Sequence, residues 1–142
     1  MVLFMPKKYY LDTCIWLDYW ENRKNKFRPL GEWAFEVIKN IDNEGGFILF
    51  SQKVKEELEE KYSYEKIKKI ISIIPNTNII FIMENTRQLR QAVKLARTLK
   101  IPRGDALHAI LAREYDAVLV TRDKHFLELS CIIKVKKPED LI

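Results

Sequence analysis

The chain has little glycine, proline or cysteine, because its 142 residues include only 4 Gly, 5 Pro and 2 Cys. So few Gly and Pro residues exclude a collagen-like or low-complexity chain. The two cysteines, Cys14 and Cys131, are too few for a disulfide framework or a four-cysteine zinc site.

Long apolar runs are also missing. No run approaches the roughly 20 residues of a membrane-spanning helix. Pro6 ends the apolar segment Met1–Met5 before it reaches the roughly 7 residues of a signal-peptide core. We therefore expect a cytoplasmic protein that makes no use of a membrane.

Apolar residues make up 47% of the sequence and charged residues 32%, which is enough to bury a core. The length suits one domain, and no linker or repeat interrupts it, so we expect a single domain over residues 1–142. The 25 basic and 20 acidic residues give a net charge of +5. This charge agrees with an anionic partner without proving one.

Short apolar runs alternate with longer amphipathic stretches, a pattern typical of parallel strands joined by helices. The predicted strands are Lys8–Asp12, Phe47–Phe50, Asn78–Ile82, Ala117–Val120 and Cys131–Val135. The predicted helices are Thr13–Glu21, Gly31–Asn43, Gln52–Tyr62, Tyr64–Ile74, Asn85–Lys100 and Arg103–Glu114, with a short one at Lys124–Leu129. The expected fold class is α/β, a three-layer α/β/α sandwich around a mainly parallel sheet of about five strands.

Four acidic residues stand where predicted elements begin or end. Asp12 closes the first strand and Asp123 follows the fourth. Asp105 begins a helix, and Glu57 lies in the first turns of the helix after the second strand. Because ligands of open parallel sheets usually bind at the carboxyl ends of the strands, we expect these four side chains to converge there.

Such a convergence favours a metal ion. Like charges packed together raise each other's pKa, and a divalent cation removes this conflict. Ligands that are all oxygen atoms favour Mg²⁺ or Mn²⁺ over Zn²⁺. A cation of this kind activates water and neutralises charge on a phosphodiester, so the four acids predict a metal-dependent phosphoryl-transfer site.

Each acid also has a structural explanation. Asp12 and Asp123 could cap the helices that follow them, and Asp105 could favour its helix dipole. His108, one helical turn after Asp105, is better explained by packing or hydrogen bonding among its apolar neighbours than by metal binding. The joint placement of the acids favours a site, provided that the parallel sheet forms.

Four motifs, in order along nearly the whole chain, resemble those of PIN-domain ribonucleases. They are Tyr9–Thr13, Ser51–Leu58, Gly104–Ala112 and Leu119–Phe126. The sequence is most similar to the small VapC-like toxins of toxin–antitoxin pairs. The resemblance therefore implies a PIN-like fold and an endoribonuclease, dependent on Mg²⁺ or Mn²⁺, that hydrolyses RNA phosphodiesters with metal-activated water. It also implies a small antitoxin partner and a homodimer.

The resemblance also implies roles for particular residues. Asp12, Asp105 and Asp123 would hold the metal, and Glu57 would complete the cluster directly or through water. The hydroxyls of Thr121 and Thr13 would orient water or a carboxylate. The sequence leaves two points open. Glu56 adjoins Glu57, although the offset from Ser51 favours Glu57, and His125 stands where many members carry another acid, which leaves the number of metal ions open.

A basic ridge lies in the predicted helix Asn85–Lys100, a stretch that contains no acid. It consists of Arg87, Arg90, Lys94 and Arg97, which recur at helical spacing. The ridge could follow an RNA backbone or receive an acidic partner segment. It is equally well explained as the solvated face of an amphipathic helix. An alternative to the nuclease is a non-catalytic PIN-like module that binds RNA or protein.

Overall fold

The computed structural model describes residues 6–142, so the segment Met1–Met5 lies outside the described residues. Within them, one sheet contains β1 (Lys8–Leu11), β2 (Phe47–Ser51), β3 (Ile79–Ile82), β4 (Val118–Val120) and β5 (Val135–Lys136). The strand order is β3-β2-β1-β4-β5, and each neighbouring pair is parallel. The predicted parallel sheet of about five strands is confirmed.

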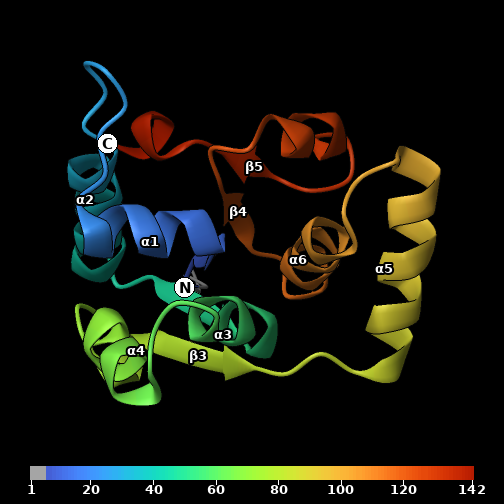
Figure 1. Ribbon diagram of the computed structural model, residues 1–142, viewed down its shortest axis with the longest axis horizontal. Coiled ribbons are helices and arrows are strands. Elements are labelled where there is room, and N and C mark those ends of the chain that lie inside the picture. The colour runs from blue at the N-terminus through green and yellow to red at the C-terminus, as the bar shows by residue number, and fades with distance from the viewer. Residues whose placement is uncertain (1–5) are drawn as a thin grey trace, which may run out of the picture.

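Helices cover both faces of the sheet. They are α1 (Thr13–Glu21), α2 (Leu30–Asn43), α3 (Gln52–Glu59), α4 (Tyr64–Ile71), α5 (Thr86–Leu99) and α6 (Arg103–Glu114). The connections through α1 to α4 run outward to the edge strand β3, and α5 and α6 lead back to β4. Right-handed crossovers place these two groups on opposite faces, and Figure 1 shows α1 to α4 toward the left and α5 and α6 toward the right. The predicted three-layer sandwich is confirmed.

None of the helices within residues 6–142 combines the length and the apolar character that a membrane span requires.

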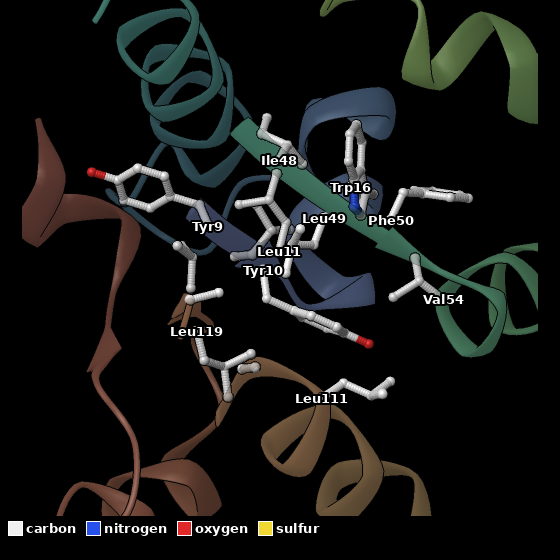
Figure 2. Packing of buried hydrophobic residues seen from close by; sticks show 14 of the residues in the cluster. Tyr9, Tyr10, Leu11, Trp16, Ile48, Leu49, Phe50, Val54, Leu111 and Leu119 are labelled. Carbon is white, nitrogen blue, oxygen red and sulfur yellow. The ribbon is translucent and has the colours of Figure 1, made fainter. Parts of the chain in front are cut away.

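The core lies on both sides of the central strands β1 and β2. Tyr9 and Tyr10 point to opposite sides of β1, and both are buried (Figure 2). On the other side of the sheet from α6, Trp16 of α1 packs edge-on against Phe50 of β2, with ring centroids 5.7 Å apart. Burial on both faces explains why these strands read as continuous apolar runs instead of alternating ones.

Capping residues set where three of the helices begin. Ser51, Ser63 and Asn85 each accept a hydrogen bond from the backbone N–H three residues later, at the starts of α3, α4 and α5. The predicted boundaries of α1 and α6 are confirmed. The predicted ends of α3 and α4 were three residues too late, because the backbone turns after Glu59 and Ile71.

The last strand lies later than the predicted range Cys131–Val135. The N–H of Ile133 donates to the carbonyl of Leu129 and closes a turn. Ile133 is therefore buried, at 6% exposure, without joining the sheet. Pairing with β4 begins at Lys134, whose carbonyl accepts the N–H of Leu119, and β5 follows it. Ile133 therefore packs into the core from a turn, whereas Ile132 is 41% exposed.

Gly31 lies where α2 passes close to the end of α1. A Cβ atom at this position would lie 2.5 Å from the Cα of Asn22 and 2.7 Å from the carbonyl oxygen of Asp18. Because backbone atoms yield less than flexible side chains, we predict that Gly31→Ala destabilises the protein by about 1–3 kcal/mol. Gly104→Ala is the control, since its methyl group meets only the Lys53 side chain, at 3.2 Å. Equal melting temperatures for the two variants would contradict the prediction.

Candidate metal centre

The candidate site lies at the carboxyl ends of β1 and β4. Leu11 and Val120 are register partners in these two parallel strands. The residues that follow them, Asp12 and Thr121, therefore emerge side by side. The neighbouring connections leave β1 and β4 on opposite faces of the sheet, which opens a crevice between the strand ends. The sequence places its candidate site at this edge of the sheet.

Three side chains form the tightest group of candidate metal ligands among the described residues. Asp105, Asp123 and His125 each offer one ligand atom, and these atoms all lie within 4.8 Å of one another. The Nδ1 atom of His125 is 3.6 Å from Oδ1 of Asp123 and 3.9 Å from Oδ2 of Asp105. One cation can contact donors at this spacing. His125 is 59% exposed, yet it faces the acids.

Asp12 is held beside this group by its own hydrogen bonds. Its Oδ2 atom accepts the hydroxyl of Thr121 at 2.8 Å and the thiol of Cys14 at 3.4 Å. Asp12 occupies the N-cap position of α1, but its side chain makes no capping hydrogen bond. The structural explanation that Asp12 merely caps a helix therefore fails.

Thr121 connects two of the acids. Its hydroxyl donates to Asp12 and accepts the backbone N–H of Asp123 at 3.0 Å. Asp123 in turn accepts the N–H of His125 at 3.0 Å, at the start of the short helix η2 (Lys124–Leu129). A capping role is thus real for Asp123. The same contact fixes its carboxylate next to Asp105.

Crowding of like charge is clearest at Asp105, in the first turn of α6. Burial raises the pKa of this carboxyl above its usual value, and the charges of Asp123 and Asp12 raise it further. Nearby histidines lower the pKa without cancelling this effect. The three carboxylates therefore repel one another, which is the conflict that a bound cation relieves.

Glu57 joins the site from α3. Its Oε1 atom lies 2.6 Å from Nε2 of His108 and accepts the hydroxyl of Thr13 at 3.3 Å. The same nitrogen of His108 is 3.9 Å from Oδ1 of Asp12. Burial raises the pKa of Glu57, but the hydrogen bond and charge of His108 and the charge of Lys53 outweigh it, so the pKa is lowered. Glu57 is thus linked to Asp12 through His108.

The neighbouring acid, Glu56, lies on the exposed side of α3. Its carboxylate is close to the Gln52 amide, at 3.4 Å, and does not contact the cluster. Between the two alternatives that the sequence left open, the structure turns Glu57 toward the other acids.

The basic ridge is only partly available for a partner. Both terminal nitrogens of Arg87 donate to the Glu114 carboxylate on α6, at 2.6 and 3.1 Å. Arg87 is therefore engaged by an acid from another helix, which the absence of acids within Asn85–Lys100 did not indicate. Arg90, Lys94 and Arg97 are exposed on α5.

Sequence reasoning missed the buried polar residue Tyr10. Its hydroxyl lies 2.6 Å from Ser51 Oγ and 2.6 Å from His108 Nδ1. In the sequence, Tyr10 is an aromatic residue in an ordinary strand, and no local pattern indicates that its hydroxyl has these partners. A buried tyrosine hydroxyl requires such a partner, which is the one general signal that was present.

The sequence model of the PIN domain family matches residues 9–130. This chain belongs to the PIN domain family. The matched region of this PIN domain includes all the residues that the sequence predicted for the site. A search of curated proteins finds no match.

Solved structures share the fold of this PIN domain. VapBC2 from Rickettsia felis, bound to a DNA fragment from its promoter, is 19% identical with a TM-score of 0.65, covering 92% of this chain and 98% of that one. VapBC-1 from nontypeable Haemophilus influenzae is 21% identical with a TM-score of 0.65, covering 93% and 98%. A toxin–antitoxin complex from Klebsiella pneumoniae is 19% identical with a TM-score of 0.64, covering 92% and 97%. At these identities the likeness concerns the fold.

The crowding at Asp105 predicts a pH-dependent effect of its removal. A raised pKa means that the folded state binds this proton more tightly, so its contribution to stability is present below pH about 4 and lost as the pH rises through the folded-state value. Asn has no such proton to lose. Without divalent ions, we predict that the melting temperature of Asp105→Asn relative to wild type rises between pH 3 and pH 7.

Thermal unfolding at both pH values, in EDTA, measures this difference. Asp116→Asn, at an exposed turn residue, is the matched control. A difference between Asp105→Asn and wild type that stays constant from pH 3 to pH 7 would contradict the prediction.

Proposed function

We propose that this PIN domain is a metal-dependent endoribonuclease, the toxin of a toxin–antitoxin pair that acts in the cytoplasm. Residues 1–142 would form a single nuclease domain. The observation that carries the proposal is the meeting of Asp12, Asp105 and Asp123 at one edge of the sheet in a chain of this family.

The donor set suits Mg²⁺ or Mn²⁺. Asp12, Asp105 and Asp123 offer carboxylate oxygens, which hard divalent cations prefer. His125 adds a nitrogen, which Mn²⁺ accepts more readily than Mg²⁺. Glu57 would complete the cluster directly or through a water molecule. A divalent cation bound there would supply an activated water and neutralise charge on the phosphodiester.

The remaining residues of the site hold these groups in place. Thr121 restrains the carboxylate of Asp12, and Thr13 restrains that of Glu57. No side chain acts as a nucleophile in this proposal. Water attacks phosphorus in line with the 3′ oxygen, the bond to that oxygen breaks, and the oxygen takes up a proton. The products are a 5′-phosphate and a 3′-hydroxyl.

The proposed partners are an RNA substrate, a small antitoxin and a second copy of the chain. The antitoxin is supported by the similar structures, which include toxin–antitoxin complexes. A basic side chain of the antitoxin would fit the acidic crevice by charge. The exposed residues Arg90, Lys94 and Arg97 support contact with an RNA backbone.

One observation favours a second candidate, a non-catalytic PIN-like module that binds RNA or protein. His125 stands where the family resemblance expects another acid, and this reduces the negative charge available to hold a cation. Titration of the protein with Mn²⁺ by calorimetry separates the two candidates. Absence of binding favours the non-catalytic module.

The nuclease proposal predicts metal-dependent cleavage of a structured RNA. Because Asp12 is a proposed metal ligand, Asp12→Asn should lower the cleavage rate by about 100-fold or more, and EDTA should abolish cleavage. Asp116→Asn is the matched control, since Asp116 precedes β4 at the opposite end of the sheet and its left-handed backbone, with φ 52°, tolerates Asn. Equal cleavage by wild type, Asp12→Asn and EDTA-treated samples would contradict the proposal and indicate a contaminating nuclease.

A separate prediction concerns the exposed cations of α5. In the inactive Asp12→Asn background, changing Arg90, Lys94 and Arg97 to Gln should weaken RNA binding. Each phosphate contact that is lost should reduce the slope of log affinity against log salt by about 0.7. Fluorescence anisotropy at several salt concentrations measures the slope. An unchanged slope would show that this face of α5 does not contact RNA. The matched control removes three charges from α4 by changing Lys66, Lys68 and Lys69 to Gln.

A further inference from the structure

A chain of hydrogen bonds runs beneath the candidate site and ends on Glu57. The Tyr10 hydroxyl lies 2.6 Å from Ser51 Oγ and 2.6 Å from Nδ1 of His108. The other ring nitrogen of His108, Nε2, lies 2.6 Å from Oε1 of Glu57. Tyr10 and Ser51 have 0% exposure and His108 has 1%. The chain thus crosses the interior from β2 through β1 and α6 to α3.

The proton positions in this chain follow from its two ends. Ser51 Oγ accepts the backbone N–H of Val54 at 3.1 Å, which leaves its own proton free to donate to the Tyr10 hydroxyl. Burial raises the pKa of Tyr10, which therefore keeps a proton to donate to Nδ1 of His108. At the far end, an ionised Glu57 can only accept. A neutral His108 ring must then carry its proton on Nε2, facing Glu57.

This arrangement limits how Glu57 can lie. Among the described residues, both side-chain donors to Glu57, His108 and Thr13, contact Oε1. Oε2 is then the oxygen that can reach a metal ion or its bound water. Glu57 is on α3 and Asp105 is on α6, in different layers of the sandwich. His108, also on α6, is the side chain that joins these layers at the site.

We propose that Tyr10 and His108 are positioning residues: Tyr10 holds the ring of His108 through Nδ1, and His108 donates from Nε2 to hold Glu57 in the orientation that completes the metal site. This inference rests on the proposed function, in which Glu57 belongs to the metal cluster. Hydrogen-bond partners of metal-ligating side chains commonly change metal affinity or activity by about 10–100-fold when they are removed.

The first test reads the tautomer directly. The chain contains two histidines, His108 and His125, so the ring region of a ¹H–¹⁵N correlation spectrum holds only two sets of signals. A His125→Asn sample assigns them. In the metal-free protein we expect His108 to show a protonated Nε2 and an unprotonated Nδ1. A protonated Nδ1 with a bare Nε2 would overturn the inference.

The second test removes one hydroxyl. Tyr10→Phe keeps the buried ring but takes away the donor to Nδ1. We expect a shifted Nδ1 signal of His108, Mn²⁺ affinity by calorimetry about 10–100-fold weaker, and a lower kcat for RNA cleavage with little change in KM. Tyr62→Phe is the matched control, because the Tyr62 hydroxyl also donates to a carboxylate, that of Glu21, away from the site.

A rescue variant separates positioning from packing. Gln at position 108 can place an amide N–H near the location of Nε2, whereas Leu fills the space without a donor. We expect His108→Gln to retain most of the Mn²⁺ affinity and His108→Leu to lose it, at similar melting temperatures. Equal affinity for the two variants would overturn the inference.

The outcomes also distinguish this inference from the proposed function. Wild-type protein that neither binds Mn²⁺ nor cleaves RNA would overturn both. Wild-type protein that does both, and whose Mn²⁺ affinity and kcat are unchanged by Tyr10→Phe, would overturn the positioning role alone.

Discussion

Repulsion between carboxylates held at close range is the constraint on which this structure depends. Burial and the charges of Asp123 and Asp12 raise the pKa of Asp105, so the folded chain holds three acidic groups together at a cost. The buried strands β1 and β2 and the helices packed on both of their faces stabilise the fold against this cost. Carboxylates that repel one another without a cation, and that a bound cation stabilises, are typical of metal-dependent nucleases.

The topology explains why the acids meet. β1 lies between β2 and β4, and Leu11 is in register with Val120. The next residue of each strand therefore reaches the same crevice, and the Thr121 hydroxyl bonds Asp12 across 109 positions of sequence. The return path through α5 and α6 brings the first turn of α6, with Asp105, to the same edge.

The residues beneath the carboxylates are polar but fully buried. Removing a single hydrogen-bonding atom there would leave a buried partner unsatisfied. Ser51, Tyr10 and His108 satisfy one another, as buried polar groups must. The same contacts connect the two helical layers, since Glu57 stands on α3 and His108 on α6. One set of hydrogen bonds therefore connects Glu57 at the candidate metal centre to the buried interior of the protein.

The sequence by itself determined the sandwich, the approximate strands β1 to β4, the boundaries of α1 and α6, and the placement of Asp12, Asp105 and Asp123 at the ends of elements, because periodicity and capping are local properties. Only the tertiary structure decided that β5 begins after a turn, that Arg87 pairs with Glu114, and that His108 links Tyr10 to Glu57. The two side-chain contacts depend on partners far along the chain. Such a contact leaves no local pattern, because the backbone path alone sets which distant side chains come within hydrogen-bonding distance.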